Sequence, residues 1–154
     1  MNERYIRQTM IPEIGEAGQE KLKNAKVLIV GIGGLGSPIS LYLTAAGVGQ
    51  IGLIDDDIVS KSNLQRQILY TEAEIGQSKV ECACRRLSAL NSSTRFETYP
   101  NRFTPDNANR LVSAYDIIVD GCDNAATRYL IDDVCSRFKK PYVYGSISEF
   151  RGQV

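Results

Sequence analysis

Residues 27–57 constrain the fold of this chain more than any other stretch. Residues 27–30 form a short apolar run, as in a parallel strand covered on both faces. The pattern G-x-G-x-x-G follows at residues 31–36 and leads into a helix-like segment. A second apolar run, residues 51–54, ends in Asp55. This order predicts a strand, a glycine-rich turn, a helix and a second strand.

The same stretch predicts a nucleotide site. Glycines allow the backbone to turn tightly and to approach a phosphate, and the helix N-terminus offers unpaired N–H groups to negative charge. Asp55, at the end of the second strand, can accept hydrogen bonds from ribose hydroxyls. The alternative is that the glycines only close a tight turn, but the ordered context favours a nucleotide.

The rest of the chain continues the alternation of strands and helices. Further strands are predicted at residues 94–98, 116–120 and 141–145, and residues 151–154 resemble the start of another. Helices are predicted at residues 75–90, at about 105–112, and at about 125–138. We expect an α/β, Rossmann-like fold with a mainly parallel sheet and helices on both faces. Residues 1–154 would form a single nucleotide-binding domain, with an arm and a helix in residues 1–25.

The composition excludes several classes of protein. Eighteen basic and eighteen acidic residues give no net charge, which argues against nucleic acid and anionic membranes as partners. No apolar run approaches the roughly 20 residues of a membrane helix, and the N-terminus lacks a signal-peptide core. We therefore expect a cytoplasmic protein. The chain has no histidine and no C-x-x-C among its four cysteines, so a zinc site within it is not expected and the thiols are expected to be mostly buried.

The long polar loop at residues 58–71 helps to distinguish a nicotinamide dinucleotide from a triphosphate as the ligand. A nicotinamide-dependent oxidoreductase would use the same glycine pattern. The donors in this loop, with Lys79 beyond it, suit a triphosphate better. The P-loop pattern is absent, so separate Arg and Lys side chains would have to bind the phosphates. As alternatives, Lys79 could be a solvated lysine at a helix start and Arg66 could form a structural ion pair.

Six motifs occur in order along nearly the whole chain. They are R-Y-I-R-Q at 4–8, G-I-G-G-L-G at 31–36, A-G-V-G at 46–49, S-N-L-Q-R-Q at 62–67, G-Q-S-K at 76–79 and D-N at 123–124. Together they resemble the ThiF/MoeB/HesA family, the bacterial relatives of ubiquitin-activating enzymes. The S-N-L-Q-R-Q element is far more specific than the glycines.

The resemblance implies an ATP-dependent adenylyltransferase. Its substrate would be the C-terminal carboxylate of a small ubiquitin-like sulfur-carrier protein (ThiS/MoaD-like). The implied cofactors are ATP and Mg²⁺, with Asp123 as the metal ligand. The residues expected to bind the nucleotide are Gly31, Gly33, Gly34, Asp55, Ser62, Asn63, Gln65, Arg66, Lys79, Asp123 and Asn124. The residues expected to act in catalysis are Arg7, Asn63, Arg66, Lys79 and Asp123.

The resemblance also implies a homodimer, in which Arg7 reaches the triphosphate of the other subunit. Family members carry two C-x-x-C zinc elements and a crossover-loop cysteine that would fall after Val154, so we expect the C-terminal part of the family fold, and any zinc, beyond this sequence. Two other functions stay open: an NAD(P)-binding oxidoreductase domain, and a non-catalytic nucleotide-binding partner in a dimer.

Overall fold

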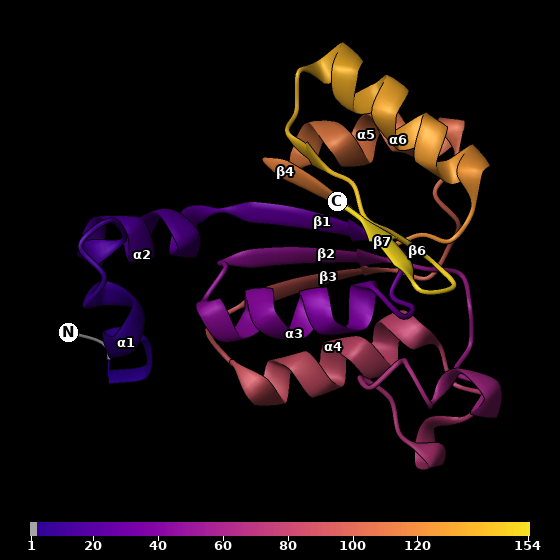
Figure 1. The fold of residues 1–154 in the computed structure, drawn as a ribbon, viewed down its shortest axis with the longest axis horizontal. Helices are drawn as coiled ribbons and strands as arrows, with labels where there is room; N and C mark the ends of the chain where they lie inside the picture. Colours follow the sequence, from indigo (N-terminus) through magenta and orange to yellow (C-terminus); the bar gives the residue numbers. More distant parts are fainter. Residues whose placement is uncertain (1–2) are drawn as a thin grey trace.

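The computed structural model describes residues 3–154, and its centre is a five-stranded parallel sheet with the order β3-β2-β1-β4-β5 (Figure 1). The five strands are β1 (Lys26–Val30), β2 (Gln50–Ile54), β3 (Arg95–Tyr99), β4 (Ile117–Asp120) and β5 (Tyr142–Val143). The order reverses between β1 and β4, which is where ligands bind in open α/β sheets. The predicted Rossmann-like parallel sheet is confirmed, and its first strand contains the predicted residues 27–30.

Helices cover both faces of the sheet, as the sequence predicted (Figure 1). In chain order the α-helices are α1 (Ile6–Thr9), α2 (Gly15–Asn24), α3 (Gly36–Ala46), α4 (Lys79–Leu90), α5 (Pro105–Ala114) and α6 (Ala125–Phe138). Helices α3 and α4 lie on one face, and α5 and α6 on the other. Three short 3₁₀ turns accompany them, at Glu3–Tyr5, Lys61–Asn63 and Glu72–Glu74.

Strand β1 shows why its sequence is apolar throughout. Val27 and Ile29 belong to the core under α3 and α4, whereas Leu28 and Val30 belong to the core under α5 and α6. Successive side chains of a strand point to opposite faces, so a strand covered on both sides needs an apolar residue at every position. Each helical layer therefore has a core of its own.

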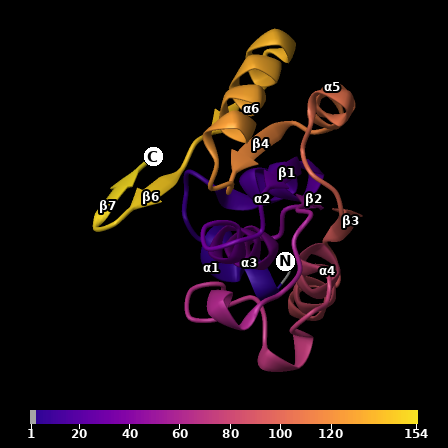
Figure 2. The ribbon, with the colours of Figure 1, turned by 90° about the vertical axis from the view of Figure 1, so that its right-hand side faces the viewer.

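Three segments differ from the expectation. The strand predicted at residues 141–145 is shorter, since β5 covers only Tyr142–Val143. Helix α4 begins at Lys79 rather than at residue 75, because Gly76 adopts a φ of +88° and the chain before it forms a 3₁₀ turn. The predicted strand at 151–154 exists as β7 (Arg151–Gln153), but it pairs antiparallel with β6 (Ser146–Ser148). This hairpin projects away from the five-stranded sheet (Figure 2).

The N-terminal helices lie at the end of the sheet where the strands begin (Figure 1). The Gln8 side chain donates to the Ala46 carbonyl at the end of α3, and the Asn91 side chain, just after α4, donates to the Tyr5 hydroxyl. The segment 3–9 is thereby attached to the C-terminal ends of α3 and α4, and Gln19 of α2 donates to the same Ala46 carbonyl. Among residues 3–154, no helix is long and apolar enough to span a bilayer.

At the opposite end of the sheet, three glycines bring backbone against backbone. A Cβ on Gly36 would lie 2.0 Å from the Gly31 carbonyl oxygen, and one on Gly121 would lie 2.5 Å from the same atom. Gly31 itself has a φ of +88°. The first and last glycines of the predicted fingerprint therefore allow α3 to approach β1 and β4 closely.

We predict that Gly36→Ala destabilises the fold by about 1–3 kcal/mol or more, the usual cost of forcing an extra methyl into a packed site. The neighbour at 2.0 Å is a backbone oxygen, so the loop itself would have to move. Urea unfolding followed by circular dichroism measures the change.

Gly34→Ala is the matched control in the same loop. Its added Cβ would meet only the Arg66 side chain, at 3.6 Å, which is ordinary contact. We expect a shift in unfolding free energy of less than about 0.5 kcal/mol, as for most surface changes. Equal destabilisation by the two variants would contradict the packing role assigned to Gly36.

Candidate functional site

A cleft of about 680 Å³ opens where strands β1, β2 and β4 end. Nine of the residues predicted to bind a nucleotide line it: Gly31, Gly33, Gly34, Asp55, Asn63, Arg66, Lys79, Asp123 and Asn124. The structure thus brings together loops that are far apart in the sequence. Ser62 and Gln65 do not line the cleft, and Arg7 lies on α1 at the other end of the sheet.

Asp55 joins the end of β2 to the glycine loop. One carboxylate oxygen accepts the Ile32 N–H at 2.7 Å, and the other accepts the Asp57 N–H at 2.8 Å. Burial raises the pKa of the Asp55 carboxyl, and the two N–H groups and the Lys79 charge oppose that rise. A carboxylate held in this way has fixed oxygens that still carry free lone pairs for ribose hydroxyls.

Two cations of the cleft are already paired with the acids that follow β2. The Lys79 ammonium is 2.8 Å from the Asp57 carboxylate, and the lysine side chain is only 4% exposed. Arg102, in the loop after β3, is 3.2 Å from the Asp56 carboxylate. The interpretation of Lys79 as a solvated lysine is therefore wrong, since it is buried and held by a neighbour.

Arg66 differs from both. Its side chain is exposed at the cleft and donates one hydrogen bond, at 3.3 Å, to the Ser62 carbonyl. Within residues 3–154 it forms no ion pair, so the structural ion pair considered from the sequence is wrong. A guanidinium with free donors at the edge of a cleft can grip phosphate bidentately.

Gln67 is a cleft residue that sequence reasoning missed. It is 4% exposed, lines the cleft beside Gly33, and leaves its Oε1 atom without a hydrogen-bond partner in the described part of the chain. Gln65, which the sequence favoured, is exposed outside the cleft, and the Ser62 hydroxyl shares a hydrogen bond with Ser60. The 3₁₀ turn at Lys61–Asn63 sets which side chains of the motif face inward, and the sequence carries no clear signal for it.

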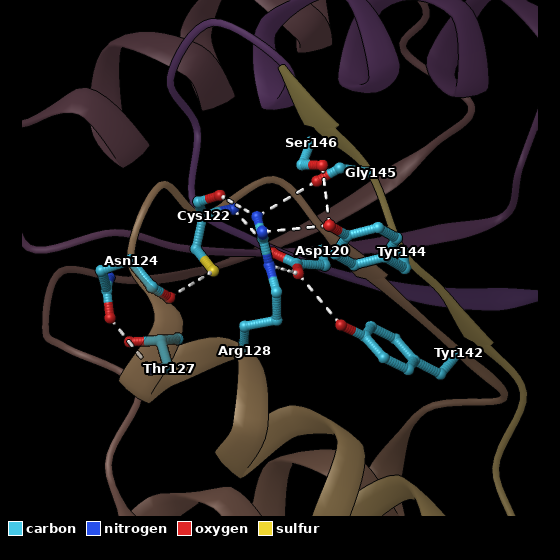
Figure 3. A network of polar contacts seen from close by, with 9 residues as sticks. All are labelled: Asp120, Cys122, Asn124, Thr127, Arg128, Tyr142, Tyr144, Gly145 and Ser146. Atoms are coloured by element: carbon cyan, nitrogen blue, oxygen red, sulfur yellow. Dashed lines mark hydrogen bonds and ion pairs between the residues drawn. The ribbon is translucent and has the colours of Figure 1, made fainter. Parts of the chain in front are cut away.

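The loop after β4 forms the opposite wall. Asp123 is exposed at the cleft, and Asn124 accepts the Thr127 N–H at 2.9 Å as the cap of α6. Beneath them, Arg128 donates to the fully buried Asp120 carboxylate at 2.9 Å (Figure 3). Arg128 also lines the cleft and was not among the residues predicted from the sequence.

Carboxylates from two segments could hold a divalent cation. Asp55, Asp56 and Asp57 have oxygens within 4.8 Å of one another, but each of the three carboxylates already accepts at least one hydrogen bond from the protein. The Asp123 carboxylate takes no hydrogen bond from any of residues 3–154. Oxygen ligands of this kind suit Mg²⁺, which binds through one or two carboxylates and the phosphates of a substrate. The residues present therefore fit magnesium on the Asp123 side.

The model of the ThiF family matches residues 5–154. A sulfur carrier protein adenylyltransferase from Thermus thermophilus is 49% identical over 152 residues, which cover 99% of this chain and 56% of that protein. A probable adenylyltransferase/sulfurtransferase, MoeZ, from Mycobacterium tuberculosis is 50% identical over 97% of this chain and 38% of its own length. The chain therefore spans about half, or less, of the length of these relatives.

Two solved structures are also similar to this chain. The E. coli tRNA N6-threonylcarbamoyladenosine dehydratase TcdA, in complex with ATP, superposes with a TM-score of 0.84 at 30% identity, over 90% of this chain and 57% of that one. E. coli MccB with MccA-N7isoASN reaches a TM-score of 0.86 at 32% identity, over 95% of this chain and 44% of that one.

We predict that the cleft cysteine is unreactive. Burial raises the pKa of the Cys122 thiol to about 12 and that of Cys135 to about 11, and only a thiolate is an effective nucleophile. Cys82 is fully buried as well, whereas Cys84 is half-buried. Iodoacetamide at pH 8, read by mass spectrometry, should label Cys84 and spare the other three. The urea-unfolded chain, in which all four react, is the control, and labelling of Cys122 as fast as Cys84 would contradict the assignment.

Proposed function

The chain belongs to the ThiF family, and on that premise we propose that it is the nucleotide-binding part of an ATP-dependent adenylyltransferase. Its substrate would be the C-terminal carboxylate of a small ubiquitin-like sulfur-carrier protein. The Thermus thermophilus relative, a sulfur carrier protein adenylyltransferase, supports this substrate, and the ATP complex of TcdA supports the nucleotide. In our proposal residues 1–154 act as one adenylation domain.

The chemistry asks little of acid–base groups. A carboxylate oxygen of the carrier attacks the α-phosphorus of ATP, the bond from that phosphorus to the β-phosphate oxygen breaks, and pyrophosphate leaves. A C-terminal carboxyl has a reference pKa of about 3.5, so it is already ionised at neutral pH and needs no general base. The absence of histidine from the sequence is therefore no obstacle. The site must instead position the reactants in line and offset phosphate charge.

Side chains of the β1 and β2 ends would bind the nucleotide. The Gly34 backbone would approach the phosphates, and the fixed Asp55 carboxylate would accept hydrogen bonds from the ribose. Asn63 and Arg66 would donate to the phosphates from the loop after β2. The Lys79 ammonium donates one hydrogen bond to Asp57 and keeps two further donors for the phosphates. The bond to Asp57 fixes the position of the ammonium.

The β4 end would supply the metal ligand. Asp123 would hold magnesium and Asn124 would border it, across the cleft from Arg66. When bound there, magnesium would offset the negative charge of the phosphates. Ser62 and Gln65, outside the cleft, would act only if the loop rearranged around the nucleotide, so their roles stay predictions.

One observation carries this proposal: Arg66 presents a guanidinium without an ion-pair partner among residues 3–154 to a cleft that the uncommitted Asp123 carboxylate also lines. This arrangement has the charges that a triphosphate and its metal require. A nicotinamide dinucleotide has a diphosphate and requires no metal, so it would leave the Asp123 carboxylate without a ligand.

We predict that ATP with Mg²⁺ binds and that NAD binds more weakly, and that Asp55→Ala and Arg66→Ala each weaken ATP binding. In the full-length protein with its carrier, Arg66→Ala should lower ATP–pyrophosphate exchange about 10²–10³-fold, as does the loss of one preorganised donor elsewhere. Isothermal titration calorimetry and isotope exchange are the two measurements.

Arg86→Ala is the matched control, because Arg86 is exposed on α4 and does not line the cleft. It should bind ATP as the unchanged protein does. Equal or tighter binding of NAD would favour an oxidoreductase domain, and ATP binding without exchange in the full-length protein would favour a non-catalytic dimer partner.

We also propose a homodimer in which Arg7 serves the cleft of the neighbouring subunit. Arg7 is exposed on α1, at the end of the sheet opposite to its own cleft (Figure 1). An arginine so placed contributes to a nucleotide site only across an interface. Its planar, permanently charged fork suits phosphate.

For this dimer we predict intersubunit complementation. Arg7→Ala should lower adenylation by the full-length protein while leaving the dimer intact. Mixing it with Arg66→Ala should restore part of the activity, since each mixed dimer holds one site with both arginines. Exchange assays on the mixture, with heterodimers counted by native mass spectrometry, give the readout. Heterodimers that form without recovered activity would exclude action across the interface.

A further inference from the structure

Arg128, on the first turns of α6, contacts two separate segments of the cleft wall (Figure 3). One is the loop of residues 121–124, here called the Asp123 loop. The other is the segment of residues 144–147, which links β5 to the β6–β7 hairpin and contributes Ser146 and Ile147 to the cleft.

The hydrogen bonds of Arg128 account for four of the five N–H groups of a guanidinium. Its Nε donates to the Asp120 carboxylate at 2.9 Å. Its Nη2 donates to the Cys122 carbonyl at 3.0 Å and to the Gly145 carbonyl at 3.2 Å, and its Nη1 donates to the Tyr144 hydroxyl at 3.4 Å. The protein itself therefore uses nearly all of the donor capacity of this arginine.

The anchor of this arrangement is the Asp120 carboxylate, which is fully buried. It accepts the Cys122 N–H at 2.8 Å and the Tyr142 hydroxyl at 3.0 Å in addition to Arg128. A carboxylate with three donors in a dry site holds them in one geometry, because any loosening leaves a buried charge without compensation.

The far end of the arrangement is Tyr144. The guanidinium lies 4.6 Å from the centre of its ring, and its hydroxyl donates to the Ser146 hydroxyl at 2.7 Å. The chain of contacts thus runs without a gap from the carbonyl that precedes Asp123 to a side chain of the opposite segment.

We propose that Arg128 is a positioning residue that couples the Asp123 loop to residues 144–147, so that both segments of the cleft wall take up their working positions together. The role rests on the proposed adenylation, because the Asp123 loop carries the proposed magnesium ligand. Arg128 acts through the carbonyls of Cys122 and Gly145 and through Tyr144. The contacts to ATP from Gly34, Asp55 and Arg66 lie on other loops and do not involve it.

The variant that tests this is Arg128→Lys. It keeps a positive charge for Asp120 but lacks the planar fork that reaches two carbonyls at once. We expect faster hydrogen–deuterium exchange in both segments, residues 119–125 and 142–149, of the full-length protein without nucleotide. Its matched control is Arg137→Lys on the same helix, whose exposed pair with Asp133 is not part of the cleft lining.

Kinetics supply the second readout. Arg128→Lys should lower kcat for ATP–pyrophosphate exchange about 10- to 100-fold, the usual effect of losing a residue that orients a metal ligand. The dissociation constant for ATP without Mg²⁺ should stay within about twofold, since a residue with no ligand contact alters orientation more than ground-state binding. A purely structural role would instead lower the melting temperature, lower kcat and raise the dissociation constant for ATP together.

Hydrogen–deuterium exchange that becomes faster in only one of the two segments, or in neither, overturns the coupling. An unchanged kcat for ATP–pyrophosphate exchange overturns it as well. If Arg128→Lys does not fold, Tyr144→Phe decides. It keeps the ring beside the guanidinium and removes the hydroxyl between Arg128 and Ser146, so faster exchange at 142–149 supports the coupling and unchanged exchange overturns it. The hydrogen–deuterium exchange measurement uses no nucleotide, so it is valid even if the unchanged enzyme shows no adenylation. A lack of adenylation by the unchanged enzyme would count against the proposed function alone.

Discussion

The contact between the glycine loop and the start of the Asp123 loop sets the geometry on which the rest of the cleft depends. Gly31, Gly36 and Gly121 meet backbone to backbone, where any Cβ would lie within 2.0–2.9 Å of a main-chain atom. The two loops follow β1 and β4, the strands between which the sheet order reverses. Because α3 and the β4 end are pressed against one carbonyl, the helix N-terminus and the Asp123 loop share a single cleft. The residues at the cleft wall are thus positioned by packing beneath it.

The charges of the cleft divide into those committed to the protein and those free for a ligand. Lys79, Arg102 and Arg128 each have an aspartate partner, and Asp55 holds two backbone N–H groups. Arg66 and Asp123 have no such commitment among residues 3–154. Charges that the protein already holds in place need little reorganisation when a ligand binds, whereas the charges without a protein partner form new interactions with the ligand. A ligand with a negative centre and an associated cation fits this division.

Much of the fold could be predicted because its signals are local. The strand β1 and the glycine turn follow from apolar runs and G-x-G-x-x-G, and helix α6 follows from its periodicity. Helix α4 begins four residues later than predicted, because Gly76 adopts a positive φ and the regular helix starts only after it. Nine of the site residues could be placed at the cleft because they lie at strand ends or in motifs. Gln67 was not predicted although it belongs to the 62–67 motif, because the motif does not show which of its side chains face the cleft. Arg128 was not predicted because it is held at the cleft by the buried Asp120 carboxylate, 8 residues away.

The two ends of the sheet explain why a site of this kind would need a second subunit. Tyr5 and Gln8 are bonded to the C-terminal ends of α4 and α3, so the N-terminal segment is fixed where the strands begin. The cleft lies where they end, and β1 and β2 separate the two regions (Figure 1). Rearranging the arm within one subunit would break those bonds, whereas an adjacent subunit can present its strand-start end to the cleft without any such change. If Arg7 has a role at a phosphate, the geometry of the sheet therefore directs it to another chain.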